Sequence, residues 1–416
     1  MLYSLLVRLA LPFAFLRLAL KGAVDPRYRG HWRERLGYIS VTATEVWIHA
    51  VSVGEVRAAI PLILGLKARL PEARILVTTS TPTGRAQASQ ALSRHAAIAY
   101  LPYDTPGAVR RFLARTRPRL GLIMETEIWP VLYRECARQQ IPLCIVNGRL
   151  SERSCQRYLW LQTTIRLSLG SLSYLCAQTD TDKQRFLRLG AAPDRLVCCG
   201  NLKFDVMTPA VPPDDPLRQL FGAGRPVLLA ASTHEGEESV VLEAFRLLRQ
   251  RFPGLVLLLA PRHPHRSGAI AEAIRSDGWT LARRTETGDR AVPSVDVFLL
   301  DTLGEMGRFF AIAHVAFIGG SLVPVGGHNP LEACALGVPV IFGPHMSNFS
   351  DIARIILEHK AGMHVQDGEA LVEAASHYLD PETRTRAGRA GIALVHNNRG
   401  AVACTLNTIL PLLKRV

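Results

Sequence analysis

The sequence lacks several features that define common classes of protein. Its eight cysteines have neither the paired spacing of a zinc site nor that of a disulfide framework, and only Cys198 and Cys199 are adjacent. This cysteine pattern favours a reducing, cytoplasmic setting. No small-residue cleavage site follows the apolar N-terminus, so a secretory signal peptide is not expected. No basic stretch is interleaved with aromatic residues, which argues against a nucleic-acid-binding surface.

Acidic side chains are scarce as well. The chain has 35 Asp and Glu residues against 49 Lys and Arg residues, a net charge of +14. Such an excess of positive charge implies an acidic partner, which could be nucleic acid, an anionic membrane face or a phosphorylated substrate. With 416 residues, 48% of them hydrophobic, the chain is globular and longer than one core usually covers. Two domains of about 200 residues each are therefore expected.

The first 20 residues are apolar but are interrupted by Arg8, Pro12 and Arg17. A charged residue inside a spanning helix costs about 2.5 to 3.5 kcal/mol, so a helix that lies at the membrane interface is favoured over a span. Basic residues continue after it at Lys21, Arg27, Arg29, Arg33 and Arg35. Each adds about 1 kcal/mol of attraction to anionic lipid. We predict an anchor to the anionic cytoplasmic leaflet, with a membrane span as the alternative.

Apolar runs alternate with helical patterns along the rest of the chain. Strands are predicted at 45–50, 74–79, 96–101, 120–124, 141–146, 173–177, 195–200, 226–231, 255–260, 297–300, 314–321 and 338–342. This alternation indicates parallel sheets with helical crossovers, hence an α/β fold. The proline-rich stretch 207–216 is the clearest linker.

The predicted organisation has five parts. They are a membrane-association segment (1–40), a Rossmann-like acceptor domain (41–205), a linker (206–216), a Rossmann-like nucleotide domain (217–394) and a C-terminal helix packing back toward the first domain (395–416).

The stretch from Gly319 to His345 is the most informative. A predicted strand ends in Gly319, Gly320 and Ser321, and a second glycine pair precedes a helical pattern. A glycine-rich entry into a helix presents backbone N–H groups that suit a phosphate and need no metal. Glu332, one turn inside the helix, is placed to hold ribose hydroxyls. These features indicate a nucleotide, although an ordinary turn between strand and helix would also need glycines.

Polar residues follow other predicted strands. Glu125 and Glu127 end one strand and Lys203 follows another, at the edge where open α/β sheets bind ligands. In the second half, ligand-type residues follow four consecutive strands, which favours a single cleft. Asp180 and Asp182 have the spacing of a metal-binding pair, but capping of the next helix is the favoured interpretation.

Two parallel-sheet domains facing a cleft, with a nucleotide site and no evident metal site, make the GT-B architecture of glycosyltransferases. Ten strings in order, over about 300 residues, resemble the bacterial 3-deoxy-D-manno-octulosonic acid (Kdo) transferases. They are HAVSVGE, TTSTPTG, LPYD, METEIWP, NGRLS, LKFD, STHEGEE, PRHP, GGSLVPVGGHNPLEA and FGPH.

The resemblance implies a function and partners. It implies transfer of Kdo from the donor CMP-Kdo to the lipid A precursor, a bisphosphorylated lipid, in lipopolysaccharide biosynthesis. The reaction would be inverting, independent of metal and without a cofactor. The enzyme would act at the cytoplasmic face of the inner membrane and bind no nucleic acid.

The resemblance also implies roles for particular residues. Glu34, in WRERLG, matches the general base, and Glu55, in SVGE, is the second candidate. Glu125 and Lys203 match positions that steady charge in the transition state. The positions that match CMP-binding residues are Arg262, His263, Leu303, Gly304, Glu305, Asn329, Pro330, Leu331 and Glu332. The chain departs from the pattern at Arg33, where a glycine is expected after the tryptophan.

Two other functions stay open from the sequence. A basic nucleic-acid-binding or membrane-binding protein that is not an enzyme would share the charge, and a related GT-B enzyme would use a UDP-sugar. Binding to oligonucleotides would distinguish the first, and competition by UDP against CMP the second.

Overall fold

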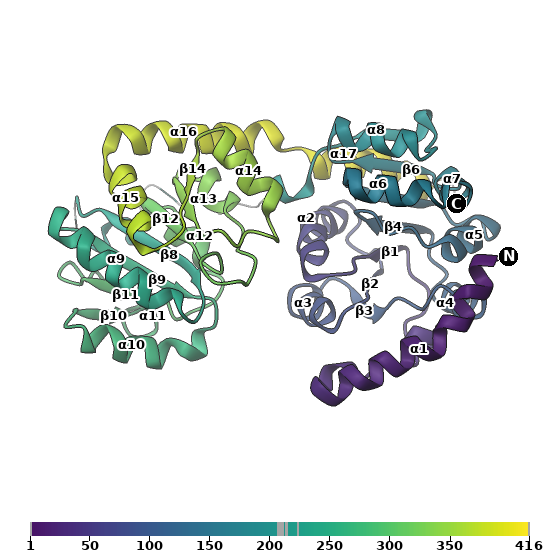
Figure 1. Cartoon of the computed structure of the whole chain (residues 1–416), viewed down its shortest axis with the longest axis horizontal. Coiled ribbons are helices and arrows are strands. Elements are labelled where there is room, and N and C mark those ends of the chain that lie inside the picture. Colours follow the sequence, from purple (N-terminus) through teal and green to yellow (C-terminus); the bar gives the residue numbers. More distant parts are fainter. Residues whose placement is uncertain (1, 206–211, 213–214, 223, 415–416) are drawn as a thin grey trace. The chain divides into compact units, whose positions relative to one another are not determined.

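The computed structural model describes residues 2–205, 212, 215–222 and 224–414. Most of the predicted linker at 206–216 therefore lies outside the described residues. The chain divides into two compact units (Figure 1), one made of Met1–Asp205 with Asn398–Val416 and the other of Val206–Asn397. Each unit contains a seven-stranded sheet in which all pairs of neighbours are parallel.

The sheet of the first unit has the strand order β3-β2-β1-β4-β5-β6-β7. Its strands are β1 (Val46–His49), β2 (Ile75–Thr79), β3 (Ala97–Tyr100), β4 (Leu120–Met124), β5 (Leu143–Gly148), β6 (Tyr174–Ala177) and β7 (Leu196–Cys198). The central strands are buried along their whole length, as expected for strands covered by helices on both faces. The order reverses between β1 and β4, which makes their carboxyl ends the switch point of this sheet.

The sheet of the second unit repeats this topology, with the order β10-β11-β9-β8-β12-β13-β14. Its strands are β8 (Val227–Thr233), β9 (Val256–Pro261), β10 (Leu281–Arg283), β11 (Val297–Leu299), β12 (Val315–Ile318), β13 (Val340–Phe342) and β14 (Gly362–His364). The switch point here lies between β8 and β12. Every strand predicted from the sequence is present, and the two edge strands β10 and β14 were not predicted, because their segments, LAR and GMH, are not apolar runs.

Helices cover both faces of the first sheet. Buried apolar residues of α2 and α17 form one core with the sheet, and those of α4, α5, α7 and α8 form the other. The helices are α2 (Val53–Arg69), α3 (Pro82–Leu92), α4 (Pro106–Thr116), α5 (Pro130–Arg138), α6 (Glu152–Leu159), α7 (Gln162–Gly170), α8 (Asp180–Arg188) and α17 (Ala401–Lys414). The stretch between β5 and β6 forms two helices, α6 and α7.

In the second unit, α9, α10 and α15 share a core with one face of the sheet. Its helices are α9 (Glu237–Arg251), α10 (Ser267–Ser276), α11 (Arg284–Thr287), α12 (Met306–Phe310), α13 (Leu331–Ala335), α14 (Ser350–Glu358), α15 (Gly368–Leu379) and α16 (Pro381–Asn398). The short 3-10 helices of the chain are Pro26–Tyr28, Glu34–Leu36, Pro193–Arg195, Leu202–Phe204, Pro216–Gln219 and Pro264–Arg266.

The C-terminal helix α17 belongs to the first unit, where it packs against α2. Asp205 accepts hydrogen bonds from the backbone N–H groups of Gly400 (2.7 Å) and Val402 (2.5 Å), which caps the start of α17. Cys199 and Cys404 form a disulfide with a Cα–Cα distance of 5.4 Å. The expectation of no disulfide is corrected here, because a pair 205 residues apart leaves no spacing signal in the sequence.

The N-terminal helix α1 (Leu2–Val24) lies along the side of the first unit that carries α4 (Figure 1). It is long and apolar enough to cross a membrane, with a mean hydropathy of 1.6 over Tyr3–Val24, and almost none of it is buried. Its large exposed apolar side chains are Leu5, Leu6, Leu9, Phe13, Leu16, Leu20 and Val24.

Candidate active site

The switch point of the first sheet brings two predicted site residues together. Glu55 lies in the first turn of α2, directly after β1, and Glu125 follows β4. Because β1 and β4 are paired neighbours, their carboxyl ends lie side by side. Glu125 raises the pKa of Glu55 by charge repulsion, so the two carboxylates lie close enough to interact.

Glu55 is the most strongly perturbed carboxyl group at this edge. It is 9% exposed, and burial, followed by the charge of Glu125, raises its pKa to about 8. Its carboxylate accepts hydrogen bonds from the Val51 backbone N–H (2.9 Å) and the Ser52 hydroxyl (3.1 Å). Ser52 in turn caps α2, which fixes the position of Glu55 in the first turn. A carboxyl group with this pKa is suited to exchange protons near neutral pH.

Glu125 and Glu127 follow β4, and Glu125 has an unusual backbone conformation. Glu125 has a φ of +56°, a left-handed conformation that costs free energy for a residue with a side chain. Its backbone N–H still donates to the carbonyl of Val146, so the turn remains attached to β5. Burial raises the pKa of Glu127 to about 7. Two carboxyl groups at the carboxyl edge of the first sheet, those of Glu55 and Glu127, therefore have pKa values near neutral pH.

Glu34 lies apart from this pair, in the 3-10 helix Glu34–Leu36. Its carboxylate accepts hydrogen bonds from Arg85 (2.6 Å) and from the backbone N–H of Tyr100 (2.7 Å), and its other oxygen lies 3.0 Å from Nδ1 of His31. These contacts attach the loop to α3 and β3. The Glu34 carboxylate is therefore engaged by an ion pair and a backbone amide.

Lys203 lies in the 3-10 helix Leu202–Phe204, which packs against α2. The Asn147 side-chain oxygen accepts a hydrogen bond from the Leu202 backbone N–H (3.0 Å), and Asn201 accepts one from that of Lys203 (3.0 Å). Asn147, which ends β5 with a φ of +55°, therefore positions the segment that carries Lys203. A residue of the NGRLS string thus contacts the LKFD string directly.

The switch point of the second sheet is shaped by a bulge in β8. The pairing of β8 with β9 shifts between Ala231 and Thr233, and Ser232 has a φ of +59°. The bulge brings the β8 backbone against β12, where a Cβ atom on Gly319 would lie 2.5 Å from the Ser232 carbonyl oxygen. Gly319 is therefore required by close backbone packing.

The glycine-rich turn is held by a residue that the sequence interpretation had not assigned. Glu237 is fully buried and accepts hydrogen bonds from the backbone N–H groups of His234 (2.9 Å), Gly320 (2.7 Å), Ser321 (3.0 Å) and Leu322 (2.9 Å). The prediction that the Gly319–Ser321 amides bind phosphate is corrected accordingly, because the Gly319 N–H also donates within the sheet, to Ala231. Glu237 is one of three acids in the motif STHEGEE, and that acidic motif was the available signal in the sequence.

Three histidines gather beside this turn. Nε2 of His234 lies 2.9 Å from Nε2 of His328 with the two rings stacked, and His263 packs edge-on against His234. Burial lowers the pKa of both His234 and His263 below the usual value. Arg262, half-buried, follows β9 next to His263. These residues place cationic and hydrogen-bonding groups at the carboxyl ends of β8 and β9.

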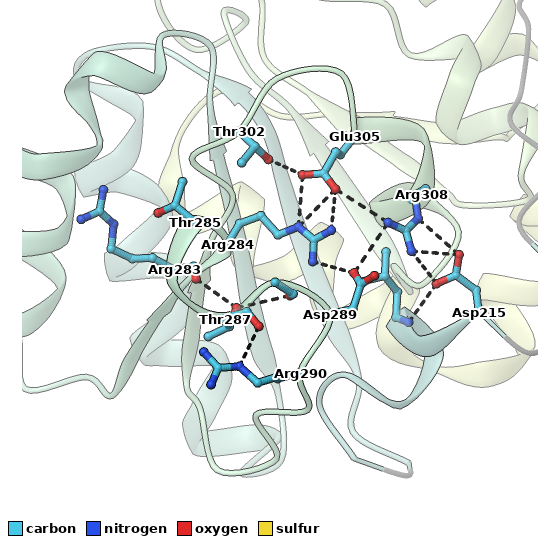
Figure 2. Close-up of polar contacts among 12 residues, drawn as sticks. Asp215, Arg283, Arg284, Thr285, Thr287, Asp289, Arg290, Thr302, Glu305 and Arg308 are labelled. Carbon is cyan, nitrogen blue, oxygen red and sulfur yellow. Dashed lines mark hydrogen bonds and ion pairs between the residues drawn. The ribbon is translucent and has the colours of Figure 1, made fainter.

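Hydrogen bonds and ion pairs of the Glu305 side chain hold the turn formed by Leu303, Gly304 and Glu305 (Figure 2). The Glu305 carboxylate accepts hydrogen bonds from Arg284 (3.1 Å) and from the Thr302 hydroxyl, and Arg308 binds Asp215 (3.0 Å). The hydrogen bond with Arg284 lowers the pKa of Glu305. The Glu305 side chain therefore holds the turn, while Leu303 and Gly304 are exposed.

The remaining predicted positions surround α13. Asn329 accepts a hydrogen bond from the Leu331 backbone N–H (3.1 Å), and Pro330 occupies the N-cap position without a side-chain hydrogen bond. Leu331 is buried in the core, whereas Glu332 is half-buried. The helix has only five residues, so its dipole is smaller than the sequence pattern indicated.

Asp180 and Asp182 lie in the first turn of α8, whose capping residue is Thr179. Asp182 accepts hydrogen bonds from Leu150 (2.8 Å) and Thr179 (2.5 Å), so it holds the NGRLS loop. Among the residues that the structure describes, no group of three His, Cys, Asp or Glu side chains has the arrangement of a metal site.

Comparisons with known proteins identify the class and then the family. The crystal structure of a glycosyltransferase from Rickettsia africae ESF-5 aligns with 91% of this chain and 100% of its own, at 13% identity and a TM-score of 0.54. Two Rossmann-like units with parallel sheets and this similarity define a GT-B fold.

A family model described as 3-deoxy-D-manno-octulosonic-acid transferase (kdotransferase) matches residues 30–206. The chain is 36% identical to a 3-deoxy-D-manno-octulosonic acid transferase of Haemophilus influenzae, over 99% of this chain and 98% of that protein. It is 40% identical to one of Bordetella pertussis, over 88% and 87%. The chain belongs to the Kdo transferase family and is a glycosyltransferase.

Replacement of Glu237 tests the account of the glycine-rich turn. In Glu237→Gln one amide oxygen remains as an acceptor, but the NH₂ group faces backbone donors, so we expect a loss of about 2–4 kcal/mol in the free energy of unfolding. Urea denaturation measures this loss. Glu235→Gln, at an exposed position on the same loop, should change stability by less than about 0.5 kcal/mol. Equal effects of the two substitutions would contradict the assignment.

Proposed function

We propose that this protein transfers Kdo from CMP-Kdo to the lipid A precursor with inversion at the anomeric carbon. The observation that carries the proposal is the pairing of Glu55 with Glu125 at the switch point of the first sheet, in a chain of this family. The acceptor hydroxyl attacks the anomeric carbon, the bond to the CMP phosphate breaks, and a carboxylate takes the hydroxyl proton.

We propose Glu55 as the general base. Its raised pKa, its burial and its place in the first turn of α2 support this role. Glu34, the base implied by the resemblance, stays the alternative, and its ion pair with Arg85 weighs against it. Glu125 and Lys203 are proposed to steady the charge that develops on the sugar in the transition state.

The donor is proposed to bind through residues of the second unit. Arg262 and His263 offer positive charge and hydrogen bonds to the CMP phosphate, and the backbone of Leu303 and Gly304 lies exposed on a braced turn. Asn329 to Glu332 would contact the nucleoside.

We further propose that transfer needs no metal and takes place at the cytoplasmic face of the inner membrane. The exposed apolar side chains of α1, with the basic residues that follow it, support attachment to an anionic surface.

Turnover of CMP-Kdo with lipid A precursor tests the function. We expect a mass increase of the acceptor by one or more Kdo residues, equal rates with and without EDTA, and inhibition by CMP but not by UDP. Loss of activity in EDTA that magnesium restores would contradict metal independence. Inhibition by UDP alone would favour a UDP-sugar donor, the second candidate from the sequence.

Glutamine replacement separates the two candidate bases. Glu55→Gln keeps the size of the side chain but cannot accept a proton, so turnover should fall about 10²- to 10⁴-fold. Glu34→Gln should retain more than about a tenth of the turnover, a change below about 1.4 kcal/mol. CMP affinity, measured by calorimetry, should be unchanged in both variants. The opposite ranking of the two turnover numbers would assign the base to Glu34.

The expected pH dependence of kcat/KM follows from the pKa of Glu55, which is about 8. Below this pH the carboxyl group keeps its proton and cannot act as a base, so kcat/KM should rise about tenfold per pH unit and level off above about pH 8. Rates measured between about pH 6 and 9 give this profile. In Glu55→Gln the residual rate should lose the inflection; an inflection that persists unchanged would show that another group titrates.

A further inference from the structure

A pocket of about 810 Å³ opens in the first unit beside the loop that follows α1. Its wall is formed by the loop from His31 to Ser40 and by one side of α4, including Arg111 and Arg115. Gly37 makes the close contact between loop and helix possible, because a Cβ atom there would lie 2.2 Å from the Ala108 carbonyl oxygen. The pocket does not include Glu55, Glu125 or Lys203.

Three guanidinium groups, those of Arg33, Arg111 and Arg115, line this pocket. Among the described residues none of them has an ion pair with a carboxylate. The one carboxylate in the wall, Glu34, is held by Arg85 at 2.6 Å, so it is already paired. The pocket therefore carries about three uncompensated positive charges.

Two of these guanidinium groups, those of Arg111 and Arg33, are held in place before any ligand binds. Arg111 donates from Nε (2.9 Å) and Nη2 (2.7 Å) to the Leu36 carbonyl, and its guanidinium lies 4.6 Å from the centre of the Tyr38 ring. Arg33 lies 5.6 Å from the same ring. Guanidinium groups ordered in this way bind phosphate oxygens with little further loss of conformational freedom.

The pocket also adjoins the apolar helix α1. Trp32, which lines it, packs against Phe15 of α1 with ring centres 5.7 Å apart, and Phe15 packs in turn on Tyr103. The pocket wall is therefore attached to α1, the helix that also carries exposed apolar side chains.

We propose that this pocket binds a phosphomonoester on the headgroup of a lipid. A phosphomonoester carries a charge of about −1.5 to −2 and three acceptor oxygens, which match the three guanidinium groups better than the single charge of a phosphodiester. The volume exceeds that of a phosphate and leaves room for a sugar ring. The inference deepens the proposed function, since the pocket would hold a phosphate of the acceptor while its hydroxyl reacts elsewhere.

Vesicle binding tests the proposal without any turnover. Phosphatidylcholine vesicles are prepared with phosphatidic acid, a phosphomonoester, or with phosphatidylglycerol, a phosphodiester, at matched surface charge. We expect the full chain to bind the phosphatidic acid vesicles more tightly. The double variant Arg33→Gln, Arg115→Gln should lose some affinity for both lipids because it carries less positive charge, but its loss on phosphatidic acid should be at least about tenfold greater than its loss on phosphatidylglycerol. Arg111 is left unchanged because it also holds the loop.

Arg110→Gln is the matched control, since Arg110 is exposed on α4 but does not line the pocket. It removes one charge and should keep the preference for phosphatidic acid. Equal losses on both lipids, or an equal loss in Arg110→Gln, would overturn the proposal. A competition experiment with soluble glucosamine 1-phosphate distinguishes a lipid ligand from a soluble one. If this compound displaces the protein from phosphatidic acid vesicles at micromolar concentration, the ligand of the pocket is a soluble phosphate and not a lipid, which would overturn the proposal.

Acceptor kinetics separate this proposal from the proposed function. In the double variant the KM for the lipid A precursor should rise at least about tenfold, while the KM for CMP-Kdo stays unchanged. An unchanged acceptor KM would overturn the assignment of the pocket to the acceptor. If the wild-type chain transfers no Kdo at all, the proposed function fails, and the vesicle measurements alone decide whether the pocket binds phosphomonoesters.

Discussion

Parallel pairing of β1 with β4, and of β8 with β12, is the constraint on which the other features of both units depend. In a parallel sheet all carboxyl ends lie at one edge, and the crossing helices turn away in opposite directions where the strand order reverses. Residues that follow these central strands are therefore brought together even when about 70 residues separate them, as with Glu55 and Glu125. The same topology gathers the residues after β8 and β12 in the second unit.

Buried carboxylates perform different tasks in the two units because their surroundings differ. Glu237 is surrounded by four backbone N–H groups, and it fixes the conformation of the glycine-rich turn. Glu55 has only two donors and a second carboxylate nearby, so burial raises its pKa into the range of proton transfer. Glu34 is paired with Arg85. Residue type alone does not distinguish a structural acid from a catalytic one.

The arginines of the chain fall into groups with and without acidic partners. Arg284 and Arg308 in the second unit are neutralised by Glu305, Asp289 and Asp215, and this network holds a turn. Arg33, Arg111 and Arg115, which line the pocket beside the loop after α1, have no such acidic partners among the described residues, and the first two lie against Tyr38. Within the described residues, the excess charge that the composition reports includes a group of arginines next to the exposed apolar helix.

The sequence by itself determined the α/β class, twelve of the fourteen strands and the family, because hydrophobic periodicity and motif order are local or sequential properties. It also indicated that Asp182 is a structural acid. The partners of each motif residue were decided only by the tertiary structure. Gly320 and Ser321 donate to Glu237, Cys199 meets Cys404, and Arg85 neutralises Glu34 through contacts between segments far apart in the chain. Hydrogen bonds and pKa values depend on distances in space, and no spacing in a single sequence reports those distances.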